Sequence, residues 1–137
     1  MRGEMGDKLT DDSEILFRQV HPNSFQDGEP GSDRFRPSEL DQNMLSVDRS
    51  SLTSAANAHA LYTSTGKKSV AVFGVSVGEF GAESISCVED SIEKTEAEPA
   101  DPAHALADYS AHAASKQKLV AKRLKRLAIE RGCLYCP

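Results

Sequence analysis

Six basic side chains lie within eleven residues near the C-terminal end of the chain: Lys116, Lys118, Lys122, Arg123, Lys125 and Arg126. Clustered cations of this kind bind acidic surfaces, either the phosphates of a nucleic acid or the carboxylates of a protein. No aromatic residue is interleaved among them, so stacked bases would have no platform. The alternative is a solvated helix face whose charge is balanced by the acidic segment 89–101. As contact residues for a protein partner we predict Lys118, Lys122, Lys125 and Arg126, and we expect at most weak binding of nucleic acid.

A second set of candidates joins a cation, a hydroxyl and a carboxylate from three parts of the chain. Arg18 lies in an apolar run, where an unpaired guanidinium is costly, so it lies at a sheet edge, pairs with a carboxylate or binds an anion. Ser46 lies between two apolar residues, and its hydroxyl is either satisfied by the backbone or available for chemistry. Glu79 follows an apolar run, where site residues often lie, but the flanking Gly78 and Gly81 are equally typical of a turn.

Histidines and cysteines offer weaker candidates. His104 and Asp108 fall on one face of a predicted strand, and a histidine beside a carboxylate can act as a base. Cys133 and Cys136 have the spacing of zinc ligands, but no second cysteine pair completes the set of four that structural zinc requires. Because the chain has three cysteines, an odd number, we expect reduced thiols and neither a disulfide framework nor a metal site.

The charge of the chain is divided between two regions. The 137 residues carry 16 basic and 21 acidic side chains, a net charge of −5, but residues 116–137 hold seven of the basic residues and one acid. This division argues against a uniformly basic nucleic-acid binder. No run approaches the ~20 apolar residues of a membrane span, and acids stand in the first twelve residues where a signal peptide has its apolar core. We therefore predict a cytoplasmic protein with no membrane partner.

The strands that would carry these candidates are predicted from short apolar and β-branched runs. They cover residues 15–20, 44–47, 69–77, 85–88 and 103–109. The run 69–77 is apolar on both faces, as expected for the buried centre of a sheet. Gly74 within it indicates a bulge or the close approach of another backbone.

Two helices are predicted from hydrophobic residues at helical spacing. The first covers residues 52–62, with Leu52 and a satisfied core histidine, His59, on its buried stripe. The second covers residues 115–131, with Ser115 as its N-cap and Leu119 on its buried stripe. Gly132 directly after it is the residue type that commonly ends a helix.

The rest of the chain is predicted to be irregular. Residues 1–13 read as a mobile tail ahead of one domain, 14–137, which includes a long loop over 22–43 and an acidic, solvated loop over 89–102. Phe25 and Phe35 are expected to anchor the long loop. The predicted fold class is α+β, with about five short strands in a mostly antiparallel or mixed sheet and two helices, the second basic and C-terminal.

Parts of the sequence resemble known proteins. The runs Leu-Phe-Arg-Gln-Val-His-Pro over 16–22 and Gly-Cys-Leu-Tyr over 132–135 resemble a group of small uncharacterised bacterial proteins. More distantly, Arg18, Ser46 and Glu79 are similar to the Arg, Ser and Glu pattern of ADP-ribosyltransferase folds. That resemblance implies NAD as cofactor, with Arg18 on its phosphates, Ser46 supporting the site and Glu79 stabilising the ribosyl cation.

The strong signatures of common enzymes are absent from the sequence, including a glycine-rich phosphate loop, a nucleophile elbow and a zinc-binding helix. We therefore expect a non-catalytic protein-binding or accessory module without a cofactor. Its expected contact surfaces are the loop 22–43 and the basic helix. The alternative is an NAD-binding transferase that uses Arg18, Ser46 and Glu79.

Overall fold

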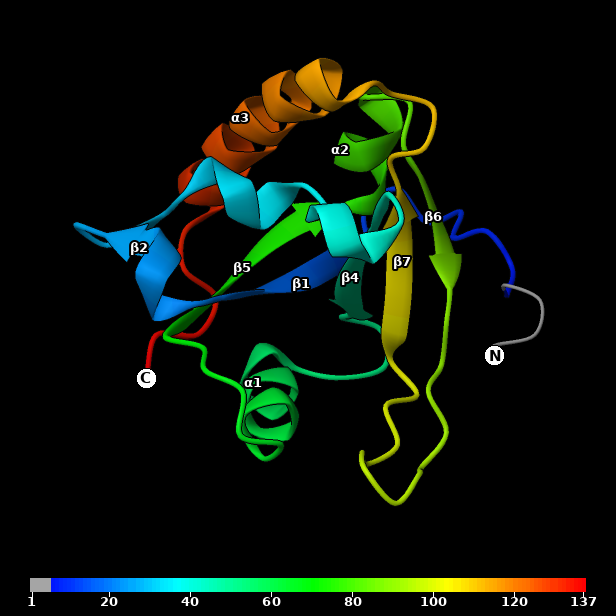
Figure 1. Ribbon diagram of the computed structural model, residues 1–137, viewed down its shortest axis with the longest axis vertical. Helices are drawn as coiled ribbons and strands as arrows, with labels where there is room; N and C mark the ends of the chain where they lie inside the picture. The colour runs from blue at the N-terminus through cyan, green and yellow to red at the C-terminus, as the bar shows by residue number, and fades with distance from the viewer. Residues whose placement is uncertain (1–5) are drawn as a thin grey trace.

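A five-stranded antiparallel sheet organises the computed structural model, which describes residues 6–137 (Figure 1). Its strands are β1 (Ile15–Val20), β4 (Met44–Arg49), β5 (Ala71–Ser76), β6 (Ser86–Glu89) and β7 (His104–Asp108), in the spatial order β5-β1-β4-β7-β6. Three α-helices accompany it: α1 (Ala55–Thr63), α2 (Val77–Ala82) and α3 (Ala114–Arg131). The predicted α+β class is confirmed.

The larger core lies between one face of the sheet and α3. Alternate residues of each strand face this core, for example Leu16 on β1, Val47 on β4 and Ala105 on β7, and all three are almost completely buried. Leu124 and Phe80 bring α3 and α2 onto the same core. Figure 1 shows α3 along one end of the molecule and α1 at the opposite end.

A second, smaller core lies on the other face of the sheet, under α1. Phe17, Val72 and Ala58 form it. The helix begins at Ala55, because the Ser54 hydroxyl accepts a hydrogen bond from the backbone N–H of Asn57 at 3.1 Å and so caps the first turn. The predicted buried stripe is wrong at Leu52, which precedes the helix and is 55% exposed.

The strand β5 is fully buried, but it lies at the edge of the sheet and not at its centre. Its free edge is covered by the C-terminal segment: the backbone N–H of Val72 donates to the Tyr135 carbonyl, and that of Leu134 donates to the Val72 carbonyl. A bulge or the approach of another backbone was predicted at Gly74, but side chains approach it instead: a Cβ there would lie 2.6 Å from Ile15 Cγ2 and 2.7 Å from Leu134 Cδ1. Apolar residues on both faces therefore indicated burial of β5 correctly, but not its place in the sheet.

The segment 22–43 was expected to be a loop and contains short regular elements. A hairpin, β2 (Phe25–Gln26) with β3 (Glu29–Pro30), turns at Asp27-Gly28, where both residues have positive φ as a tight hairpin turn requires. Three 3₁₀ turns follow or precede it: η1 (Pro22–Ser24), η2 (Ser32–Phe35) and η3 (Glu39–Asp41). As predicted, Phe25 and Phe35 pack on the body, and the Tyr109 hydroxyl donates to the Phe35 carbonyl.

The helix α3 ends as predicted and begins differently. Its last residue is Arg131 and Gly132 follows it with positive φ. The N-cap is Ala113, so the predicted cap, Ser115, lies inside the helix. The predicted burial of Leu119 is wrong: its side chain is 51% exposed, and Gln117 lies inside instead, donating to the carbonyls of Tyr109 and His112.

Both chain ends hold further differences from prediction. Of the predicted mobile tail, residues 1–5 lie outside the described part, and residues 6–9 instead pair with β6, where Leu9 donates to the Cys87 carbonyl. An edge strand has free backbone groups that such a segment can satisfy. Cys133 and Cys136 form a disulfide, which corrects the expectation of reduced thiols, while Cys87 is free and buried. Among residues 6–137, no helix has the length and apolar character needed to cross a membrane.

Candidate functional site: a cavity where the sheet opens

The two central strands β1 and β4 are paired at one end only. Their register pairs are Leu16 with Arg49 and Phe17 with Asp48, whereas β1 pairs with β5 along all six residues. Beyond Phe17 and Asp48 the strands separate, and residues 18–20 of β1 have no register partner in residues 44–47 of β4. We call this opening the seam.

Arg18 fills part of the seam. Its Nε donates to the Arg34 carbonyl at 2.6 Å and its Nη1 donates to the Ser46 carbonyl at 3.1 Å. A guanidinium has five N–H donors, so three remain without a recorded protein acceptor among the described residues. Of the three alternatives for Arg18, pairing with a carboxylate is therefore not observed, and a guanidinium with spare donors in an opening suits an anion.

A cavity of about 340 Å³ lies along the seam. Its walls come from β1, β4 and the first residue of β7, from the helix α1 and the residues that follow it, from the segment 34–41 and from the acidic loop. Polar side chains dominate the lining, which includes Arg18, Gln19, Arg34, Asp41, Ser46, Asp48, Tyr62, Lys67, Asp101 and His104. Arg18 and Ser46, which the sequence singled out separately, thus lie at one cavity.

Three buried side-chain atoms of the described residues have no hydrogen-bond partner there, and all three belong to residues that line this cavity. They are Gln19 Nε2, Arg34 Nε and Asp48 Oδ1. Gln19 is only 7% exposed, and its other amide atom, Oε1, accepts a hydrogen bond from Ser69 at 2.7 Å. Buried polar atoms are normally paired, so their concentration at one place marks this cavity as a site for polar ligands.

Two carboxyl groups lie together in the cavity wall. Burial, a hydrogen bond to Asp101 and the charge of Asp101 raise the pKa of Asp48 to about 8. A neighbouring like charge disfavours the ionisation of a carboxyl group, so Asp48 keeps its proton at neutral pH. Asp48 lies on β4, opposite Phe17 and therefore on the face that α1 covers.

The cationic side of the cavity is Arg18 with Arg34. Burial, followed by the positive charge of Arg34, lowers the pKa of Arg18 to about 10, which still leaves it protonated at neutral pH. Lys67 also lines the cavity, and its Nζ lies 5.2 Å from the centre of the Tyr62 ring, within range of a cation–π contact. The cavity therefore presents positive charge and a carboxyl pair within one small volume.

Glu79, the third residue of the predicted transferase pattern, does not line this cavity. It lies in α2 and not in a simple turn: its carboxylate accepts from the Ser76 backbone N–H at 2.8 Å and from Arg131 at 2.9 and 3.0 Å. Burial raises the pKa of Glu79, but the hydrogen bonds from Arg131 and Ser76 outweigh it and the net shift is downward. Both oxygens are engaged in holding α2 to α3.

The histidine candidates have structural contacts. His59 Nε2 lies 2.8 Å from the Ser69 carbonyl, as expected of a satisfied core histidine. His104 lies 2.9 Å from the Asp90 carboxylate and not beside Asp108, whose carboxylate accepts from the backbone N–H of Ser110. Asp90 was expected to be solvated and is buried. Among residues 6–137, no group of three or more His, Cys, Asp and Glu is arranged to hold a metal.

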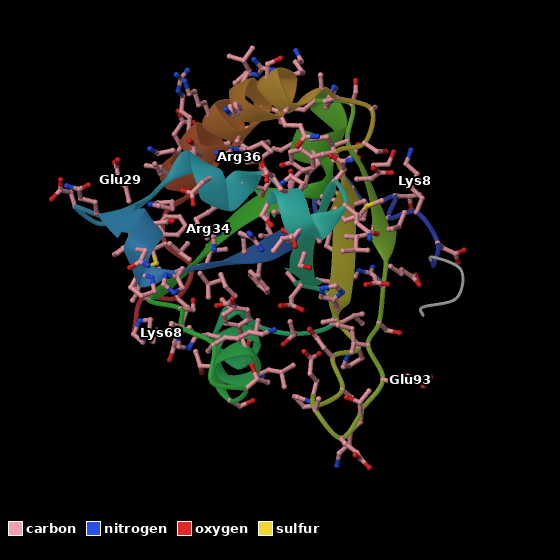
Figure 2. All side chains as sticks on the ribbon, in the orientation of Figure 1. Lys8, Glu29, Arg34, Arg36, Lys68 and Glu93 are labelled. Atoms are coloured by element: carbon pink, nitrogen blue, oxygen red, sulfur yellow. A yellow bond between two sulfur atoms is a disulfide. The ribbon has the colours of Figure 1, made fainter. Side chains whose placement is uncertain are left out.

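The basic face of α3 lies away from the seam. Within residues 6–137, none of its four predicted contact residues has a carboxylate within ion-pair distance, whereas Arg123 and Arg131 pair with Glu83 and Glu79. The acidic loop does not balance this charge: Figures 1 and 2 show it, with Glu93, at the end of the molecule opposite α3. A groove of about 480 Å³ separates α3 from the β2–β3 hairpin, with Lys122, Lys125, Arg126 and Glu29 among its lining residues.

Comparison of the chain with protein-family models, with curated proteins and with solved structures finds no match. A function for this protein is therefore inferred from the positions and contacts of its own side chains.

The sequence did not single out the residues that complete the seam cavity: Gln19, Arg34, Asp48 and Asp101. Two of them carried a signal. Gln19 is a polar residue inside an apolar strand, and Asp48 directly follows the predicted strand 44–47. Arg34 and Asp101 lie in irregular segments, and only the folded chain brings them to the cavity.

Proposed function

We propose that the protein is a non-catalytic binding module whose seam cavity binds a small polar molecule that carries an anionic group. The observation that supports this most directly is the gathering of three unpartnered buried polar atoms, with the spare donors of Arg18, at one cavity. A carboxylate or phosphate accepting from Arg18 and Arg34 would pair donors that the protein leaves unpaired. Such charge-assisted bonds contribute about 1.5–3 kcal/mol each.

The size of the cavity supports a small ligand. Pockets for drug-sized ligands and cofactors range from roughly 300 to 1,000 Å³, and about 340 Å³ is at the lower end. A dinucleotide such as NAD is poorly matched to it, and Glu79 is engaged elsewhere. The proposal therefore keeps Arg18 and Ser46 from the transferase alternative and assigns them to binding.

Titration calorimetry with acetate and inorganic phosphate tests the proposal. We expect saturable binding to the wild type, weakened at least tenfold in Arg18→Gln. The matched control is Arg36→Gln: Arg36 is nearby in sequence but does not line the cavity, and Figure 2 shows it beside α3. If Arg18→Gln does not fold, Arg34→Gln takes its place. Equal binding by wild type and both cavity variants would refute the proposal.

A second candidate function is recognition of an acidic protein partner through α3. It is favoured by a specific observation: Lys118, Lys122, Lys125 and Arg126 lie on one helix without a carboxylate partner among the described residues. The hairpin of segment 22–43, the other predicted contact surface, forms the opposite wall of the same groove. The two predicted surfaces are therefore contiguous.

Cation-exchange chromatography at pH 7 tests whether this basic face is available. Despite its net charge of −5, we expect the protein to bind the resin, because a local cluster of cations suffices. The triple variant Lys122→Glu, Lys125→Glu, Arg126→Glu should flow through. A control with the same change in charge, Lys8→Glu, Lys68→Glu, Lys94→Glu, should still bind. Equal behaviour of the two variants would show that α3 is only a solvated face.

Nucleic acid stays the weaker alternative for this face, since no aromatic residue accompanies the cations. A cytoplasmic, bacterial setting also stays a prediction. The Cys133–Cys136 disulfide makes that prediction worth testing, because disulfides are rare in the cytoplasm.

A further inference from the structure

From the arrangement of charges in the seam cavity we infer that its ligand is amphoteric: an anionic group held by Arg18 and Arg34, joined to an amino or guanidino group held by Asp48 and Asp101. This inference rests on the proposed function and names the chemical class of the ligand. A free small molecule, rather than a macromolecule, is the occupant that a cavity of about 340 Å³ fits.

The unpartnered atoms require a ligand with both kinds of hydrogen-bonding group. Gln19 Nε2 and Arg34 Nε are donors without a hydrogen-bond acceptor, and the only carboxylate paired with Arg34 among the described residues, Asp33, lies 3.6 Å from its Nε, too far for a hydrogen bond. Asp48 Oδ1 is a carboxyl oxygen without a hydrogen-bond donor, and within residues 6–137 the Asp48 carboxyl group has only Asp101 as a neighbouring partner. An inorganic anion would satisfy the two donors and gain nothing from this carboxyl pair. A simple amine would do the reverse.

The two groups meet β4 at different positions. Arg18 on β1 donates through Nη1 to the Ser46 carbonyl of β4, and Asp48 is two residues further along β4, a rise of about 7 Å along its backbone. Asp101 comes from the acidic loop and completes the carboxyl pair. The ligand should therefore present its anionic and cationic groups at opposite ends of one small molecule.

Binding of a cationic group should change the protonation of the Asp48 carboxyl. Before binding, Asp48 holds a proton at neutral pH. A cationic group placed beside it favours the ionised form, so the proton leaves as the ligand enters. The cavity also contains the titratable side chains of Asp41, Tyr62, Lys67, Glu98 and His104. A variant at Asp48 is therefore needed to assign any released proton.

Calorimetry with ω-amino carboxylates of increasing length, from glycine to 6-aminohexanoate, tests the inference. Each is compared with the unsubstituted carboxylate and the alkylamine of the same length. We expect at least one amphoteric compound of this series to bind at least tenfold more tightly than both of its matched controls. Titrations in buffers of different ionisation enthalpy should show that its binding releases protons.

The variant Asp48→Asn separates this inference from the proposed function. It should bind the amphoteric compound no better than the matched carboxylate and release no proton. If the amphoteric compounds bind no more tightly than their carboxylates, the inference is wrong and the proposed function stands. If no carboxylate binds and Arg18→Gln changes nothing, both are wrong.

Discussion

At the scale of single residues, the most unusual group is the Asp48 carboxyl, which keeps its proton at neutral pH. Burial is the main cause of its raised pKa, and Asp101 adds to it. The strand position of Asp48 opposite Phe17 holds it against the α1 face, where it cannot turn freely to solvent. This single side chain therefore makes the stability of the protein depend on pH in an unusual direction.

We expect the contribution of Asp48 to the free energy of unfolding to fall as the pH rises from about 4 to about 8. Below this range Asp48 is protonated in both the native and the unfolded chain, so its contribution is fully present. Within it, the unfolded chain loses the proton and the native chain keeps it, so stability falls. In Asp48→Asn the side chain at this position cannot ionise, so the variant does not show this fall in the free energy of unfolding. At pH 8 the variant should exceed the wild type by about 1 kcal/mol or more, since one unit of pKa corresponds to ~1.4 kcal/mol.

Urea denaturation at pH 5, 7 and 9 measures this difference. Asp27→Asn, a change at an exposed residue of the hairpin turn, is the control and should follow the wild type. Parallel pH curves for the wild type and Asp48→Asn would contradict the expected role of this carboxyl.

Single residues also show the limit of prediction from sequence. Arg18 and Ser46 were recognisable because each interrupts an apolar run, and the structure places both at the seam. Asp101 was not recognisable, because an acid in an acidic, proline-containing loop has the composition of a solvated residue. Its contact with Asp48 depends on how β7 returns the chain along β4, and local patterns contain no information on that pairing.

At the scale of elements, hydrophobic periodicity predicted the strands and the long helix well. It failed where hydrogen bonds between nearby residues determine the local structure. The helix α2 has six residues, too few for a hydrophobic period, and a capping box between Ser76 and Glu79 holds it. Its two glycines were taken as a turn. The strand β5 was taken as central because both of its faces are apolar, but the C-terminal segment covers its free edge.

The packing of this C-terminal segment on β5 depends on a residue without a side chain. Gly74→Ala would place a Cβ 2.6 Å from Ile15 Cγ2 and 2.7 Å from Leu134 Cδ1, so one or both of these packed side chains must move. We expect a loss of about 1–3 kcal/mol in the free energy of unfolding, as for other overpacked sites. Gly81→Ala is the control, since nothing lies within 4 Å of its added Cβ. Equal stability of both variants would show that the contact is easily relieved.

At the scale of the whole molecule, the opposite charges lie at opposite ends. The basic face of α3 and the acidic loop with Glu93 are separated by the sheet (Figures 1 and 2). The sequence predicted both regions but paired them with each other, because they are close along the chain. The antiparallel return of β7 carries the chain from one end of the molecule to the other, and this explains why proximity in sequence misled.

The incomplete pairing of β1 with β4 predicts a pattern of hydrogen exchange across the molecule. Backbone amides of β4 that face the seam should exchange faster than those that β4 pairs with β7, because strand pairing protects an amide. Exchange measured by NMR at each residue tests this. Equal protection on the two sides of β4 would mean that the opening is closed in solution.

The seam also has a mechanical consequence. The sheet consists of two ribbons, β5-β1 and β4-β7-β6. The ribbons pair with each other at one end only, near Phe17 and Asp48. Arg18 belongs to one ribbon and Asp48 to the other. A molecule that bridges Arg18 and Asp48 would therefore fix the angle between the two ribbons. Its binding would also restrain the outer edges of the sheet, which are formed by β5 and β6.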